Sequence, residues 1–132
     1  MGVPCPKGEP GIVRRHQRRV EDEKALRECY AEVDARDAGY CWVTGRYTQS
    51  GAVDPRVRRE HHHIVKRSRD KGLIDKPHNV ITVCAEAHKL IEAGWIIVEG
   101  KDARKRLFFH WRSDLKASQK PFTIRAMLGR AQ

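Results

Sequence analysis

Three consecutive histidines, His61 to His63, are the residues of this sequence best suited to chemistry. Asn79 follows sixteen positions after His63, and His88 follows nine positions after Asn79. Imidazole nitrogens bind divalent cations, and because imidazole titrates near neutral pH, one of these histidines could also accept a proton from water. The Asn79 amide could offer an oxygen ligand or orient a neighbouring group through hydrogen bonds. The set therefore contains donors for a metal site with an adjacent histidine base.

Four predicted elements must bring these residues together. Residues 57–65 predict a strand with the histidines at its end, followed by a long, basic, glycine-containing loop over residues 66–77. The β-branched segment 80–83 predicts a second strand, and residues 85–93 predict a short helix that Gly94 closes. The candidate residues fall at the ends of these elements, so three segments of the chain could converge on one point.

The N-terminal third predicts one helix over residues 21–38. Leu26, Cys29, Tyr30 and Val33 recur with helical spacing and define one apolar face, and Gly39 is suited to ending the helix. Residues 1–20 contain several Pro and Gly residues and then a basic cluster of Arg14, Arg15, His16, Arg18 and Arg19. We expect this stretch to be a flexible basic segment, with residues 21–132 forming a single domain.

The rest of the chain predicts short elements. Residues 40–45 suggest a short strand that runs into a turn, and residues 49–55 suggest a loop. Residues 95–98 and 107–111 predict two strands joined by a basic turn, and residues 123–128 predict a last short helix. The fold class expected from this order is α+β.

Composition indicates a globular protein with a polyanionic partner. The chain has 132 residues, 39% hydrophobic and 33% charged, and a formal net charge of +10. Nucleic acid is the commonest partner for such a charge, although charge alone does not exclude an inert basic surface. No apolar run is long enough to span a membrane, and residues 1–6 lack the apolar core of a signal peptide. We therefore expect a cytoplasmic protein of a bacterial host cell, or one encoded by a phage and acting inside such a cell, and no membrane partner.

The segment around the histidines resembles the HNH endonuclease family, also called ββα-metal or His-Me finger. The stretches HHHIVKRSRDKG, HNVITVC and AHKLIEAG carry this resemblance, which covers roughly residues 40–94 and is best over residues 60–94. It implies a ββα-metal core at about residues 58–94, between an N-terminal helix and a C-terminal β-hairpin. It also implies hydrolysis of phosphodiester bonds with one divalent cation, giving 5′-phosphate and 3′-hydroxyl products.

The resemblance also implies residue roles. His62 would be a metal ligand, His63 would be the general base because it directly precedes Ile64, and His88 would be the last ligand. Asn79 would either bind the metal or hold the loop and the base in place. Glu92 follows His88 by four residues and so shares its helical face, where it could complete the metal shell or remain an exposed carboxylate.

The run of histidines leaves a second register open. In that register, Glu60 and His61 would be the ligand and the base. We favour His62 and His63 because the base of the family immediately precedes an isoleucine. His61 is then expected to be a solvated or phosphate-facing neighbour.

The cysteines depart from the family pattern. Many members hold a structural zinc with two C-x-x-C pairs, whereas here Cys41 is followed by Thr44 and Cys84 by Ala87. A tetrahedral zinc site needs four donors, so we expect no structural zinc. Cys41 and Cys84 should remain close together as buried thiols, and Trp42, the hairpin and the N-terminal helix should hold the core.

Basic residues before and after the histidines are candidates for contacts with double-stranded DNA: Arg58, Arg59, Lys66, Arg67, Arg69 and Lys71. The alternative is a merely solvated charged loop. Phosphate contacts carry no sequence information, so we expect low sequence specificity and strong salt dependence.

The function expected is therefore that of a small metal-dependent HNH DNA endonuclease. Its cation would be Mg²⁺, Mn²⁺, Ni²⁺ or Zn²⁺. A phage or mobile-element setting, with phage packaging or recombination proteins as partners, follows from the resemblance alone. Two alternatives are a catalytically inert nucleic-acid-binding module on the ββα scaffold and a toxin-type nuclease domain with an immunity partner.

Overall fold

Strand β2 (Val80–Cys84) lies at the centre of the fold, because other elements cover both of its faces. The computed structural model describes residues 9–125, and the side chains of residues 13–125. Ile81 and Val83 point into the main core, and Val80 packs on the other side against Cys29 and Val33 of helix α1 (Glu9–Asp37). All five residues of β2 are buried. A continuous run of apolar and β-branched residues is what such a doubly covered strand requires.

The ββα core has the order that the sequence predicted. Strand β1 (Arg59–His63) pairs antiparallel with β2, so that His62 lies opposite Ile81 and His63 opposite Val80. Helix α2 (Ala85–Glu92) begins directly after β2, and the Cys84 sulfur accepts the backbone N–H of Ala87 at its first turn. The loop between the strands contains two short 3₁₀ turns, Lys71–Leu73 and Pro77–Asn79.

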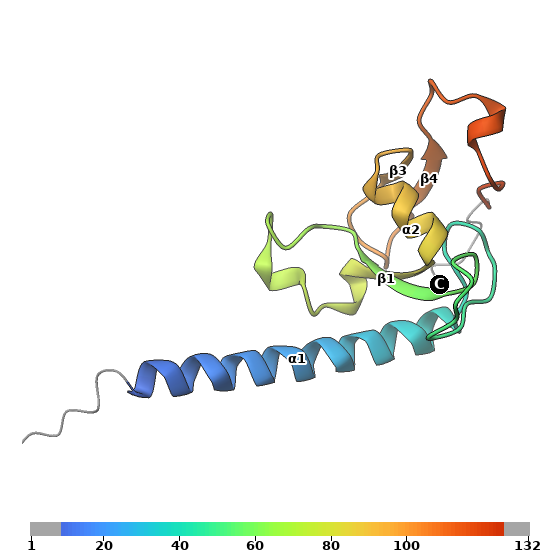
Figure 1. Cartoon of the computed structure of the whole chain (residues 1–132). Coiled ribbons are helices and arrows are strands. Elements are labelled where there is room, and N and C mark those ends of the chain that lie inside the picture. The colour runs from blue at the N-terminus through green and yellow to red at the C-terminus, as the bar shows by residue number, and fades with distance from the viewer. Residues whose placement is uncertain (1–8, 126–132) are drawn as a thin grey trace, which may run out of the picture.

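The hairpin and the core were also predicted correctly. Strands β3 (Ile96–Glu99) and β4 (Phe108–Trp111) pair antiparallel and lie beside α2 (Figure 1). Ile96, Leu107 and Phe109 join Trp42 in the main hydrophobic core. A third 3₁₀ turn, Ala117–Gln119, follows β4. The α+β fold class, with an N-terminal helix and a C-terminal hairpin around a ββα core, is therefore confirmed.

Helix α1 begins earlier than the sequence suggested. The structure gives a helix from Glu9, so residues 9–20, expected to be flexible, are helical, whereas residues 1–8 lie outside the described part. The stretch 13–20 is exposed throughout and therefore lacks the apolar stripe on which helix prediction depends. Its arginines and Gln17 nevertheless have good helix propensity. The predicted end was correct: α1 stops at Asp37, and Gly39 has a φ of +81° that suits a glycine.

Two smaller predictions need correction. Residues 40–45 do not form a strand but a tight turn, in which Tyr40 makes a single bridge to Tyr47. The turn suits Gly45, which has a φ of +76°. Residues 123–125, expected to begin a helix, are irregular, and residues 126–128 lie outside the described residues.

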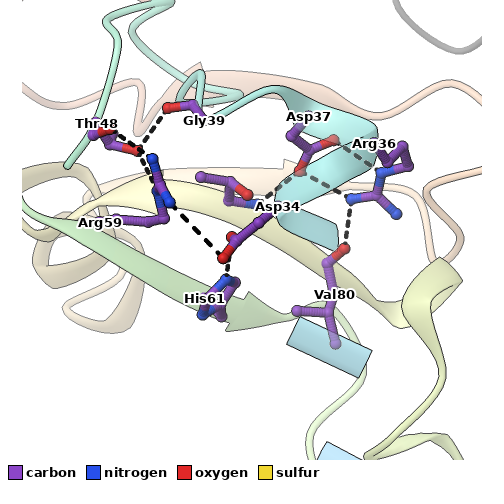
Figure 2. Close-up of polar contacts among 9 residues, drawn as sticks. Asp34, Arg36, Asp37, Gly39, Thr48, Arg59, His61 and Val80 are labelled. Carbon is purple, nitrogen blue, oxygen red and sulfur yellow. Dashed lines mark hydrogen bonds and ion pairs between the residues drawn. The ribbon is translucent and has the colours of Figure 1, made fainter. Parts of the chain in front are cut away.

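Two neighbouring residues at the end of α1 tie this helix to β2 (Figure 2). The Asp37 carboxylate is 5% exposed by residue, and it accepts the backbone N–H of Thr82 at 3.0 Å. Arg36 donates to Asp37 at 2.8 Å, to the carbonyl of Val80 at 2.7 Å and to the carbonyl of Pro77 at 2.8 Å. Its guanidinium also lies over the Trp42 ring. The charged groups of Asp37 and Arg36 are thus paired at this junction, as buried charges require.

Within the part of the chain that the structure describes, no helix is both long and apolar enough to cross a membrane.

The Asp37 junction generates a prediction about stability. We expect Asp37→Ala to lower the free energy of unfolding by about 2–4 kcal/mol, because it leaves the buried Thr82 N–H without an acceptor and Arg36 without its carboxylate. Asp37→Asn keeps an acceptor oxygen and should cost less. Urea denaturation followed by circular dichroism measures both.

Asp114→Ala is the matched control, because Asp114 accepts an equally short bond from Arg112 on an exposed surface. This variant should leave the urea midpoint nearly unchanged. Equal midpoints for Asp37→Ala and Asp114→Ala would contradict the role given to Asp37.

Candidate active site

Strand β1 divides its polar side chains between two faces, because successive residues of a strand point to opposite sides. Glu60 and His62 face helix α2, where they contact His88 and Glu92. His61 and His63 face helix α1, where both lie against the ring of Tyr30. The three adjacent histidines therefore have different surroundings and can have different roles.

His62, His88 and Glu92 come together as a candidate metal centre. Their potential ligand atoms all lie within 4.8 Å of one another. Glu92 Oε1 lies 3.4 Å from His62 Nδ1 and 3.4 Å from His88 Nε2. Ligands about 2.0–2.1 Å from a tetrahedral cation are separated by about 3.4 Å. The two distances from Glu92 therefore fit ligands of a tetrahedral cation.

The protonation state of His62 suits metal binding. The pKa of His62 is lowered to about 4; burial is the largest cause, the nearby His88 and His63 also lower it, and Glu92 opposes the shift. The imidazole is therefore neutral near pH 7. Its Nδ1 is buried without a hydrogen bond, since the 3.4 Å contact with Glu92 is not aligned as one. A buried nitrogen of this kind is normally satisfied, and a cation between His62 and Glu92 would satisfy it.

Glu60 orients His88 within this group. Its Oε1 lies 2.8 Å from His88 Nδ1, and because a carboxylate accepts, Nδ1 carries the proton. The other nitrogen, Nε2, then presents its lone pair toward Glu92. Carboxylates that hold a metal-binding histidine in this way are common in metal sites. Sequence reasoning considered Glu60 only as a ligand, although strand alternation already placed it on the same face as His62.

His63 is held in one tautomer by the main chain. Its Nε2 lies 2.9 Å from the carbonyl oxygen of Ile74, in the loop between β1 and β2. A carbonyl can only accept, so Nε2 donates, and in the neutral ring Nδ1 keeps a lone pair. His63 is thus oriented as a base at Nδ1.

Asn79 holds the same loop rather than reaching the metal centre. Its side chain is buried; Oδ1 accepts the Val65 N–H at 2.8 Å, and Nδ2 donates to the carbonyls of Val65 and Leu73. Leu73 precedes Ile74, so Asn79 fixes the segment whose carbonyl orients His63. Of the two roles expected for Asn79, these bonds support the one that holds the loop and the base.

His61 belongs to the framework on the other face of β1. Its Nε2 lies 2.7 Å from Asp34 of α1 (Figure 2). Its ring also stacks on Tyr30, with centroids 4.1 Å apart. His61 was expected to be a solvated or phosphate-facing neighbour. Its side chain is only 15% exposed. It nevertheless lines a cavity that His63, His88 and Glu92 also line. These contacts favour His62 and His63 over Glu60 and His61 as the ligand and base.

A cavity of about 310 Å³ joins the candidate base and the candidate metal centre. His63, His88 and Glu92 line it together with Lys66 and Arg67 of the loop. A phosphate in this cavity would contact a histidine base and two cationic side chains at once.

The other residues expected to contact nucleic acid are not equivalent. Arg69 and Lys71 are exposed on the loop, whereas Arg58 contacts Glu60 at 3.6 Å. The expectation that Arg59 contacts DNA needs correction, because its side chain is engaged within the fold. It donates to the Thr48 hydroxyl and carbonyl at 3.0 and 2.7 Å and pairs with Asp34. Its guanidinium is 17% exposed by side chain, so it braces the fold instead of facing solvent.

Cys41 and Cys84 lie together in the core, as predicted, and a hydrogen bond joins their thiols. This bond and burial raise the pKa of the Cys84 thiol. Thr44 and Ala87 each direct a backbone N–H at the sulfur three positions earlier, at 3.4 Å in both cases. Two thiols and a hydroxyl stand where the family pattern has four thiolates.

A ββα core with a histidine base beside a His–His–carboxylate group defines a class of metal-dependent nucleases. In agreement with this geometry, residues 41–99 match the family model described as HNH endonuclease. The matched segment contains β1, the loop, β2, α2 and β3. No curated protein and no solved structure gave a significant match. The match to the family model supports a nuclease-type function with a nucleic-acid substrate.

The lowered pKa of His62 predicts a pH dependence for the metal-free protein. Between about pH 6.5 and pH 4 the unfolded chain protonates this imidazole, and the folded chain does not. The free energy of unfolding should therefore fall on acidification through this range, by up to about 3 kcal/mol from this group. Urea denaturation at several pH values in EDTA measures it.

His62→Gln removes the titrating group and should give a shallower pH dependence than the wild type. His110→Gln is the control, because His110 is an exposed histidine on the hairpin. A His62→Gln curve parallel to that of the wild type would show that His62 does not contribute.

Proposed function

We propose that the protein is a metal-dependent endonuclease that hydrolyses phosphodiester bonds of double-stranded DNA, with low sequence specificity. One observation carries the proposal: His63, fixed by the Ile74 carbonyl, lines the same cavity as His88 and Glu92. A phage or mobile-element setting in a bacterial host remains a proposal from the sequence resemblance.

In the proposed reaction, Nδ1 of His63 takes a proton from the attacking water. The imidazolium that results keeps its Nε2–H bond to the Ile74 carbonyl, whose oxygen carries partial negative charge and so stabilises the charged ring. Asn79 contributes by holding the loop at Val65 and Leu73, which keeps the Ile74 carbonyl in place. Orientation of the base is therefore built into the backbone before substrate binds.

His62, His88 and Glu92 would hold the divalent cation. The cation would supply positive charge to the phosphate and the leaving oxygen as negative charge develops there. Two imidazoles and one carboxylate suit Zn²⁺, Ni²⁺ or Mn²⁺ better than Mg²⁺, which prefers oxygen ligands.

Lys66 and Arg67 would bind the phosphate from the loop side of the cavity. Lys66 lies 3.8 Å from Glu92 Oε2, so it can contact the phosphate near the metal centre. Such contacts position the DNA backbone without reading bases, which agrees with low sequence specificity.

The first prediction concerns the base. Cleavage of supercoiled plasmid by the wild type should require a divalent cation and stop in EDTA, and His63→Ala should lower the rate by about 10²–10⁴-fold. The measurement compares Mg²⁺, Mn²⁺, Ni²⁺ and Zn²⁺ at equal concentration.

His110→Ala is the matched control, because this exposed histidine also contacts a carboxylate but lies on the hairpin. It should cut like the wild type. If the wild type cuts with none of the cations yet still shifts DNA on a gel, the inert binding module replaces the proposal. Equal cutting by His63→Ala and the wild type would remove His63 as the base.

The second prediction concerns the carboxylate that orients His88. Glu60→Gln should weaken Zn²⁺ or Mn²⁺ binding by about 10–100-fold, because a neutral amide makes His88 a less basic ligand. Isothermal titration calorimetry on the metal-free protein measures the affinity, and its thermal midpoint checks that the fold is intact.

Glu99→Gln offers a close control, since Glu99 contacts His110 at the same 2.8 Å on the hairpin. Its metal affinity should match that of the wild type. Unchanged affinity in Glu60→Gln, or an equal loss in both variants, would remove the orienting role of Glu60.

A further inference from the structure

A second cavity, of about 870 Å³, lies between helix α1 and the loop 66–77. We call it the α1 groove. It is lined by six cationic side chains, Arg15, Arg18, Arg19, Arg67, Lys71 and Lys76, and by three carboxylates, Asp22, Glu23 and Asp75. Cations therefore outnumber acids two to one, which makes the groove attractive to a polyanion.

The α1 groove is continuous with the candidate active site. Arg67 and Ile74 line both this groove and the smaller cavity that contains His63, His88 and Glu92. Ile74 also supplies the carbonyl that orients His63. A chain of phosphates that left the active site along the loop would thus enter the groove.

The arginines in the exposed stretch 13–20 of α1 have no evident structural purpose. Residues 13–20 are exposed and contain four arginines and no acidic residue. Among the side chains of residues 13–125, Arg15, Arg18 and Arg67 take part in no ion pair, and Arg19 contacts only His16, at 3.5 Å. The helix dipole does not favour cations in the N-terminal half of a helix. These side chains therefore contribute little to folding and remain available to a ligand.

We infer that the α1 groove binds the sugar–phosphate backbone of duplex DNA on one side of the cut, with Arg15, Arg18 and Arg19 as phosphate contacts. The inference rests on the proposed nuclease function and adds a binding surface to it. The three arginines have i, i+3, i+4 spacing, so they share one face of α1. Figure 1 shows this part of α1 extending past the core, with the loop between β1 and β2 facing it.

The length of α1 places these contacts at a definite distance from the site. Tyr30 stacks on His61 beside the candidate base, and Arg15 to Arg19 lie eleven to fifteen residues earlier. At 1.5 Å per residue this is about 17–22 Å, which equals about five to six base pairs of duplex. The helix would thus extend the footprint by about half a turn of DNA.

The test compares two triple variants with equal charge loss. Arg15→Gln/Arg18→Gln/Arg19→Gln removes three groove cations and keeps good helix formers. Arg112→Gln/Lys116→Gln/Lys120→Gln removes the same number of cations, of which Lys116 and Lys120 are exposed and Arg112 is half-buried. These residues lie in the segment after β4, which Figure 1 places far from α1. Binding of each full chain to a labelled 30-base-pair duplex is measured in EDTA, where no cutting is expected, over a range of salt concentrations.

We expect the α1 triple to lower the slope of log K against log[salt] by about 2–3, because each lost phosphate contact removes about 0.9. Its affinity near 0.1 M salt should fall about tenfold or more, and the control triple should change the slope by less than one. In plasmid cleavage the α1 triple should raise KM and leave kcat near that of the wild type.

An unchanged slope in the α1 triple, or an equal fall in both triples, would overturn the inference. So would a slope change seen with single strands but absent with duplex.

The failure of the groove proposal can be distinguished from the failure of the proposed nuclease function. If the wild type cuts DNA and the α1 triple binds and cuts it identically, the inference that the α1 groove binds DNA is wrong, and the proposed nuclease function is retained. If the wild type does not cut DNA with any cation, but the α1 triple lowers the slope of log K against log[salt], the α1 groove binds DNA and the proposed nuclease function is wrong.

Discussion

The alternation of strand β1 is the constraint on which the rest of the site depends. Pairing with β2 fixes which residues face α1 and which face α2, and a slip of one residue would exchange the two sets. His62 would then leave the carboxylates of α2, and His63 would leave the loop carbonyl. The buried run of β2 protects this register, since a shift would move its apolar residues out of both cores. Hydrophobic packing at β2 therefore determines the chemistry available at β1.

Helix α1 supports β1 and β2 in a chain that has only two of the four thiolates of the family's structural zinc site. Asp34, Arg36 and Asp37 reach across from its last turns to both strands (Figure 2). Tyr30 packs on two of the histidines. The buried thiols Cys41 and Cys84 retain the positions that join the turn before β1 to the start of α2. The core is therefore stabilised by packing and hydrogen bonds across α1, which makes this helix part of the same folded unit as the ββα core.

The sequence predicted what periodicity and spacing encode. β-branched residues indicated β2, the hairpin followed from two apolar runs around a basic turn, and spacing brought His62, His88 and Glu92 into one group. Prediction from the sequence failed where a residue's role depends on tertiary contacts or on the main chain. Residues 9–20 have no apolar stripe, so the sequence did not predict their helix. Arg59 was expected to contact DNA, because the sequence does not show that its side chain bonds to Thr48 and Asp34. The group that orients His63 is a peptide carbonyl, which every residue possesses and no sequence letter identifies.

The use of the Ile74 carbonyl has a consequence for how this site tolerates change. A main-chain acceptor survives almost any side-chain replacement, so position 74 can vary chemically while the base keeps its tautomer. Alanine scanning changes only side chains, so it would not detect the Ile74 carbonyl that orients the candidate base His63. What the site cannot tolerate is a change in the path of the loop, through an inserted or deleted residue or a proline that redirects the peptide plane. The orientation of His63 therefore depends on the length of the loop more than on its composition.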